Sequence, residues 1–153
     1  MSLKQLFHFG ILFAKNPLLI APTIKASKRT IAICDLRFGS LHHSHRKENA
    51  FRHALWNWQI CEYCRNSVKN DQKTAKWAKY VTKMYENVTK NENVEAAMDL
   101  HNNAIGRKLF LDEKWTKSTE IEQILLKMME KAIKIDKIEE LINLKDQLVY
   151  ISE

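Results

Sequence analysis

Residues 48–68 read ENAFRHALWNWQICEYCRNSV, and this stretch decides the fold that the chain can adopt. It contains no glycine or proline, and its bulky apolar residues recur at helical spacing. One side of the predicted helix carries Phe51, Leu55 and Trp58, and the other carries polar residues beside Ile60. Because both sides would be costly to leave in water, we expect this helix to lie at the centre of the molecule.

The rest of the chain is also predicted to be helical. Only three Gly and two Pro occur in 153 residues, and both prolines lie near the N-terminus, so long uninterrupted helices can form elsewhere. No stretch shows the clean alternation of a half-buried strand. The chain is therefore predicted to be all-α, a single compact helical bundle of about six to seven helices over residues 1–153. Besides the central helix, helices are expected over residues 25–38, over 71–89, from Asn91 or Asn93 to about Leu109, and from Ser118 onward.

The two ends of the chain differ in composition. Residues 1–24 are apolar but are interrupted by Lys15 and two prolines, whereas a membrane-spanning helix needs roughly 20 mostly apolar residues. We interpret them as two short helices that pack onto the domain or, as the alternative, lie on an anionic membrane surface. Residues 117–153 are predicted to form C-terminal helices, with apolar residues at helical spacing from Ile121 onward.

Positive charge is concentrated in the N-terminal third. The first 50 residues hold eight Lys/Arg and two Asp/Glu, a net charge of +6 in a chain of +7. This balance favours an anionic partner such as lipid headgroups, although scattered surface lysines can also serve solubility alone. The lysines do not form the dense basic face of a nucleic-acid binder, so nucleic acid is not an expected partner. Three cysteines fit a reducing compartment, and the expected location is cytoplasmic or membrane-peripheral.

Two polar stripes, each on one face of a helix, mark the candidate functional site within residues 46–110. Desolvating such groups costs free energy unless they are hydrogen-bonded or bind a ligand. Polar residues at spacings of three or four share a helix face, so the two stripes can face each other across a helix pair. The first stripe consists of Asn49, His53 and Asn57, and the second consists of Asp99, Asn102 and Asn103.

His53, Asp99 and Asn103 are the predicted catalytic residues. Asp99 is expected to hold the imidazole of His53, fix its tautomer and raise its basicity, so that His53 activates water as a general base. Asn103 would orient a substrate oxygen or the water. In the alternative chemistry, His53, Asp99 and Glu86 bind a divalent metal ion that lowers the pKa of water. His101 diverges from Asp99 by about 200° on a regular helix and is not expected to share a ligand set with it.

Five further residues are assigned to substrate binding. Two of them are arginines that could bind phosphate or carboxylate. Gly106 would let a neighbouring backbone or a ligand approach closely. The alternative for the whole cluster is a satisfied polar network that fixes helix pairing without catalysis. The substrate-binding set is Arg52, Asn49, Asn57, Asn102 and Arg107.

Cysteines and histidines offer a second candidate for a metal site. Cys61 and Cys64 form a C-x-x-C inside the central helix, and with Cys34 and one histidine of residues 42–45 they could bind zinc. Packing of the cysteines as small hydrophobic residues is the preferred interpretation. The histidine-rich stretch lies just ahead of Asn49, so one of its imidazoles could reach the same cleft.

The two polar segments also resemble a family. NAFRHALWN at residues 49–57, followed by MDLHNNAIGR at 98–107, resembles an uncharacterised bacterial all-helical domain. That domain is associated with stand-alone proteins of Bacteroidetes-type bacteria and with C-terminal modules of wall-associated or Rhs-type proteins, where toxin domains often sit. The resemblance covers roughly residues 46–110 and implies no established reaction. The family pattern places a His-Glu pair where this chain has Tyr85 and Glu86, a departure that argues against a metal held by that pair.

These observations predict a hydrolase-like protein acting on a phosphate- or ester-containing substrate, for example a phospholipid. The alternative is a non-enzymatic helical interaction module related to bacterial toxin-type domains, in which the polar cluster is purely structural. A divalent metal ion is the one cofactor that the residues suggest.

Overall fold

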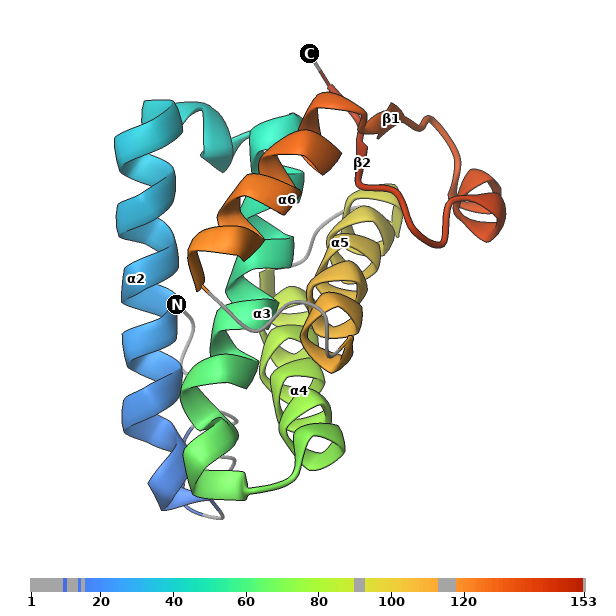
Figure 1. The fold of residues 1–153 in the computed structure, drawn as a ribbon. Coiled ribbons are helices and arrows are strands. Elements are labelled where there is room, and N and C mark those ends of the chain that lie inside the picture. The colour runs from blue at the N-terminus through green and yellow to red at the C-terminus, as the bar shows by residue number, and fades with distance from the viewer. Residues whose placement is uncertain (1–9, 11–13, 15, 90–92, 113–117, 153) are drawn as a thin grey trace.

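Helix α3, Lys47–Val68, runs through the middle of the molecule (Figure 1). The computed structural model describes residues 10, 14, 16–89, 93–112 and 118–152, and the side chains of 86–89, 93, 118 and 119 lie outside that description. The prediction of an all-α fold is confirmed. The helices in contact with α3 are α2 (Ile20–Phe38), α4 (Asp71–Thr89), α5 (Asn93–Leu111) and α6 (Ser118–Glu130).

The central position of α3 follows from its composition. Phe51 and Leu55 on one side and Ile60 on the other are all fully buried, and Trp58 is 1% exposed. Burying each such side chain contributes about 1.5–3 kcal/mol, and the gain on both sides of α3 requires neighbours all round it. Helix α6 adds Ile121 to the same core. The prediction that this helix is central is confirmed.

Helix α2 begins earlier than predicted. It was expected over residues 25–38, but it starts at Ile20 and includes Pro22 in its first turn, where a proline costs no hydrogen bond. A 3-10 helix, η1 (Pro17–Leu19), precedes it. Helix α2 ends at Gly39, whose φ of 56° suits glycine, as the sequence predicted.

Most of the predicted apolar segment 1–24 precedes these elements. Of its first 15 residues only 10 and 14 are described, so the first of the two expected short helices lies outside the described residues. The second is not a separate helix, because residues 17–24 form η1 and the start of α2. Among the residues that are described, no helix combines the length and apolar character needed to cross a membrane.

The next two helices closely match their predicted bounds. Asn70 caps α4, because its side-chain oxygen accepts the backbone N–H of Lys73 at 2.8 Å. Helix α4 spans residues 71–89, as predicted, and α5 runs from Asn93 two residues past the predicted end at Leu109.

The C-terminal prediction was wrong beyond α6. Residues 117–153 were expected to be helical, but Glu130 ends α6 and a two-residue strand follows. Strand β1 (Ile133–Lys134) pairs in parallel with β2 (Val149–Tyr150), and the 3-10 helix η3 (Ile138–Asn143) lies between them. Two-residue strands are too short to show alternation in the sequence, and β2 is held by contacts with both α3 and α5, which local propensity does not reveal.

Candidate functional site

The two predicted polar stripes meet where α5 packs against α3, the helix pair in the most extensive contact among the described elements. All their members are buried, and Asp99 is the most exposed of them at 4%. His53 is 2% exposed, while Asn57 and Asn103 are fully buried. We call the residues that meet here the α3–α5 polar cluster: Asn49, Arg52, His53, Asn57, Asp99, Asn103 and Arg107.

Gly106 sets the distance between the two helices. A Cβ atom at this position would lie 2.0 Å from the backbone oxygen of Ala54, far inside van der Waals contact. Only a residue without a side chain allows α5 to approach α3 this closely. The sequence-based expectation of a close backbone approach at Gly106 is confirmed. Asn103, one turn earlier on α5, is thereby held against α3.

Hydrogen bonds fix the tautomer of His53. Asn57 Nδ2 donates to Asn103 Oδ1 at 2.5 Å, so this oxygen is an acceptor. The Nδ1–H of His53 donates to the same oxygen at 3.2 Å, and Nε2 therefore carries the lone pair. Arg52 Nη2 donates to Nε2 at 3.0 Å. The tautomer is thus set by Asn103 and Arg52, whereas the sequence assigned this role to Asp99.

The imidazole of His53 is a weak base. Its pKa is lowered from 6.5 to about 3, chiefly by burial and then by the charge of Arg52, against a raising effect of the Asn103 hydrogen bond. Asp99 Oδ1 lies 3.3 Å from Nε2 but does not offset the burial. The predicted net rise in the basicity of His53 is therefore not observed, and the ring is neutral near pH 7.

One end of the cluster reaches the surface through Arg52. Its Nη2 also donates to Asn49 Oδ1 at 2.6 Å, and Asn49 Nδ2 donates to Asp99 Oδ1 at 3.3 Å. The side chain of Arg52 is only partly buried. It forms no ion pair with a carboxylate of the described residues.

The opposite end of the cluster is formed by Arg107. Its Nη1 donates to Asn57 Oδ1 at 2.6 Å, and burial lowers the pKa of the guanidinium. Thr82 of α4 places its Oγ1 3.3 Å from the same oxygen. The sequence analysis missed Thr82, which is fully buried in this contact.

Asn102 does not join this cluster, contrary to its predicted place on the face of Asp99 and Asn103. Its Nδ2 donates to Val149 O at 2.9 Å, and its Oδ1 accepts the Val149 N–H at 3.0 Å. The side-chain amide of Asn102 thus pairs with the backbone N–H and C=O of Val149 in β2, as the backbone of a third strand would. His101 also turns toward the C-terminal segment, where its Nε2–H donates to Gln147 O at 2.9 Å.

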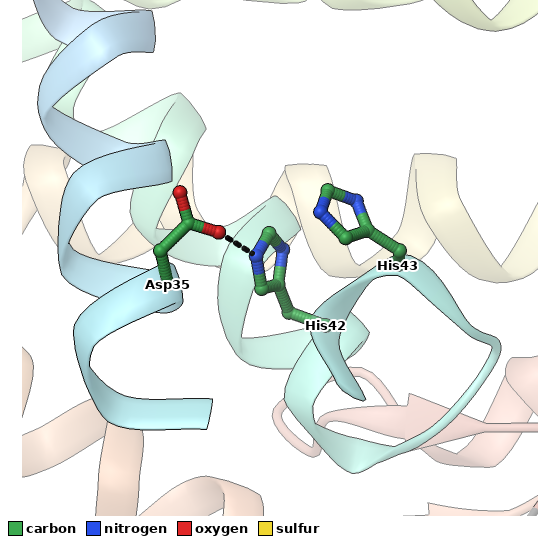
Figure 2. A group of neighbouring side chains, drawn as sticks. All are labelled: Asp35, His42 and His43. Atoms are coloured by element: carbon green, nitrogen blue, oxygen red, sulfur yellow. Dashed lines mark hydrogen bonds and ion pairs between the residues drawn. The ribbon is translucent and has the colours of Figure 1, made fainter. Parts of the chain in front are cut away.

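The predicted set of cysteines and a histidine is not assembled among the described residues, and the set of His53, Asp99 and Glu86 is described only in part. Within the described part of the chain, no group of three or more metal-ligating side chains includes His53, Asp99 or a cysteine, although His53 Nε2 and Asp99 Oδ1 lie 3.3 Å apart. The side chain of Glu86, the third predicted ligand, lies outside the described residues. A different group brings ligand atoms within 4.8 Å of one another, namely Asp35, His42 and His43 (Figure 2).

The cysteines are part of the hydrophobic core. Cys34, Cys61 and Cys64 are free, fully buried thiols. Burial raises the pKa of Cys34 to about 12 and raises the pKa values of the other two, so all three are protonated thiols near pH 7. Their packing as small hydrophobic residues, which the sequence favoured, agrees with this environment.

The group in Figure 2 lies where the chain turns at Gly39, between α2 and the 3-10 helix η2 (Gly39–His43). His42 Nε2 lies 2.8 Å from Asp35 Oδ1, and the His42 and His43 rings are 3.9 Å apart between centroids. The pKa of His43 is lowered by partial burial, by His42 and by Arg52, so Arg52 is within electrostatic reach of this group. The sequence analysis missed Asp35, because only the direction of the turn brings it to His42.

Comparison with known proteins adds a family but no function. No curated protein matches the chain, and no solved structure does. Residues 10–133 match the family described as Domain of unknown function (DUF6973), and this span includes the α3–α5 polar cluster and the group in Figure 2. The chain therefore belongs to the DUF6973 family.

Proposed function

We propose that this protein is a hydrolase-like protein that binds the phosphate or ester group of an anionic substrate at the Arg52 end of the α3–α5 polar cluster. The observation that carries the proposal is the charge state of the cluster. Arg52 and Arg107 are both partly buried, and neither forms an ion pair with a carboxylate of the described residues.

Partly buried guanidinium groups that form no ion pair within the described part of the chain favour an anionic ligand. Removing a charge from water is costly, and a bound anion repays part of that cost. Arg52 is also positioned in advance, because Nη2 is held by Asn49 and His53 while the side chain remains partly exposed. A guanidinium so held can give its remaining N–H groups to a phosphate or carboxylate with little loss of side-chain entropy.

His53, Asp99 and Asn103 supply the proposed chemistry. An anion bound to Arg52 would take the N–H that Nη2 gives to His53, while the hydrogen bond to Asn49 keeps the guanidinium in place, and the Nε2 lone pair would then be free for a water molecule. It would also weaken the positive field that helps to depress the pKa of His53. Asn103 keeps the proton on Nδ1 during this step, and Asp99, 3.3 Å from Nε2, would stabilise the imidazolium that forms.

Phospholipid is one substrate class within this proposal. We place the site of action in the cytoplasm or at an anionic membrane surface, because the free thiols fit a reducing compartment and residues 1–50 carry a net charge of +6. Membrane binding is a separate question from hydrolysis, and flotation of the protein with anionic liposomes tests it directly.

Hydrolysis of a small substrate panel tests the proposal. The panel contains bis(p-nitrophenyl) phosphate, p-nitrophenyl butyrate and a short-chain phosphatidylcholine. We expect Arg52→Gln to lower kcat/KM by roughly 10- to 100-fold, the value of a charge-assisted hydrogen bond. Arg29→Gln is the matched control, because Arg29 is exposed on α2. Absence of turnover on every panel member, or equal loss in the two variants, would overturn the proposal.

A second candidate is a non-enzymatic helical interaction module related to bacterial toxin-type domains, including the Rhs-associated modules that the sequence resembles. The burial of the cluster favours it, because His53 is only 2% exposed and its pKa of about 3 is far from that of an efficient base near pH 7. Under this candidate the cluster only stabilises the α3–α5 pair. His53→Ala and Asp99→Ala would then lower the melting temperature, while no member of the panel is hydrolysed by wild type.

A further inference from the structure

A histidine and carboxylate group lies outside the α3–α5 polar cluster, at the turn between α2 and η2. Asp35 lies one turn before the end of α2, and His42 and His43 lie at the end of η2. Figure 2 shows Asp35 on one side of the His42 ring and His43 on the other. Each of the three residues offers a ligand atom, and these atoms lie within 4.8 Å of one another.

We propose that Asp35, His42 and His43 form a binding site for a divalent transition-metal ion, with Zn²⁺ as the preferred ion. The inference is independent of the proposed hydrolysis, because it concerns metal binding by residues that the proposed reaction does not use.

The dimensions of the group suit a metal ion. Zn²⁺ holds imidazole nitrogen and carboxylate oxygen at about 2.0–2.2 Å, so neighbouring ligand atoms in a tetrahedral site lie roughly 3.3–3.5 Å apart. The His42 Nε2 and Asp35 Oδ1 atoms are now 2.8 Å apart, and all three ligand atoms fall within 4.8 Å. A shared ion therefore requires the Asp35–His42 spacing to open slightly and the His43 ring to turn toward it.

The group also combines a fixed ligand with two adjustable ones. His42 is fully buried, whereas the side chain of Asp35 is 56% exposed and His43 is exposed. The buried imidazole can stay in place while the two exposed side chains close on the ion. Their exposure also leaves solvent access for the ion and for a water molecule as a further ligand.

The donor types select the kind of ion. Two imidazole nitrogens and one carboxylate oxygen suit Zn²⁺ and its neighbours Co²⁺ and Ni²⁺. Mg²⁺ and Ca²⁺ prefer all-oxygen sites and are expected to bind weakly here. Three protein ligands leave a fourth position open, as in zinc sites that hold water.

Metal titration of the tag-free protein tests the proposal. Zn²⁺ is titrated in competition with a chromogenic chelator at pH 7.5, and Co²⁺ is titrated by its visible absorption. We expect one ion per chain, bound with a dissociation constant below about 100 µM, and tetrahedral Co²⁺ absorption. Perturbation of the His42 and His43 ring signals in NMR spectra places the ion.

Substitution of the exposed ligands makes the test specific. Asp35→Asn and His43→Gln are chosen because both side chains are exposed, so folding should survive. Each should weaken Zn²⁺ binding at least about 10-fold. The matched controls are Asp136→Asn and His101→Gln, which lie near the C-terminal segment and should bind like wild type within about twofold.

Three outcomes would overturn the metal site: no saturable Zn²⁺ binding, equal affinity in the ligand variants and the controls, or binding of Mg²⁺ as tight as that of Zn²⁺. None of these outcomes depends on whether the protein hydrolyses a phosphate or an ester. Conversely, loss of Zn²⁺ binding in Asp35→Asn with unchanged turnover would leave the metal site standing and separate it from the reaction.

Discussion

The α3–α5 polar cluster and the Asp35–His42–His43 group use the same side-chain chemistry under opposite solvent conditions. In the first, His53 and Asp99 are 2% and 4% exposed. In the second, a buried imidazole contacts a carboxylate whose side chain is 56% exposed. A buried cluster must satisfy its polar groups internally, so removal of any member strands another. In a solvent-exposed group, water can replace a lost hydrogen-bond partner. Such a group therefore tolerates substitution and can accept a ligand.

The largest effect is expected at the contact that closes the buried cluster. Gly106→Ala places a methyl group 2.0 Å from the Ala54 backbone oxygen, and backbone cannot swing aside as a side chain can. We expect the free energy of unfolding to fall by at least about 3 kcal/mol. Urea denaturation measures the change.

Gly10→Ala is the matched control for this prediction. Its added Cβ would meet no atom within 4 Å, so stability should change by less than about 0.5 kcal/mol. If the two variants unfold at the same urea concentration, the close crossing of α3 and α5 is not what holds the cluster together.

The next effect is expected on removing the carboxylate of the buried cluster. Asp99→Ala leaves Asn49 Nδ2 without the acceptor it has at 3.3 Å and removes the carboxylate that lies 3.3 Å from His53 Nε2. We expect a loss of about 2–3 kcal/mol in the free energy of unfolding. A loss below about 0.5 kcal/mol would show that water reaches the cluster and satisfies these groups.

A slightly smaller effect is expected on lowering the pH. The unfolded imidazole of His53 takes up a proton below pH 6.5, whereas the folded one resists protonation down to about pH 3. The unfolded state therefore binds more protons in this window, and stability falls as the pH falls. Between pH 7 and pH 5 this residue alone should cost about 2 kcal/mol.

The contribution of His53 is isolated by comparison with a variant that cannot titrate. His53→Gln removes the imidazole, so its free energy of unfolding should depend less on pH than that of wild type. Urea titrations of both proteins at pH 7 and pH 5 give the difference. An identical pH dependence in the two proteins would contradict the burial of a neutral imidazole.

The features that local sequence pattern controls were predictable. Apolar residues on both sides of residues 48–68 required a central helix, and helical spacing placed His53 and Asn57 on the face that meets Asn103. Gly106 was a readable sign of close approach, because no other residue lacks a side chain. These inferences need only the period of the helix and the cost of exposing apolar surface.

The features that depend on distant contacts were not predictable. Asn102 is adjacent to Asn103 in the sequence, yet its side chain binds the backbone of Val149, because β2 packs beside α5 at this position. The basicity of His53 was misjudged because its pKa is decided by the depth of burial, which no spacing reveals. Asp35 and His42 meet only because Gly39 turns the chain back on α2.

The smallest effect is expected at the Asp35–His42–His43 group, where the carboxylate of Asp35 can be compared with that of Asp99. Asp35→Ala removes the acceptor of a buried imidazole, as Asp99→Ala removes the acceptor of a buried amide. Because the Asp35 carboxylate is 56% exposed, water can replace it, and the loss in metal-free protein should stay below about 1 kcal/mol. Urea denaturation in the presence of a chelator measures it. Since the two substitutions are chemically identical, a loss at Asp35 equal to that at Asp99 would mean that solvent access does not separate the two regions.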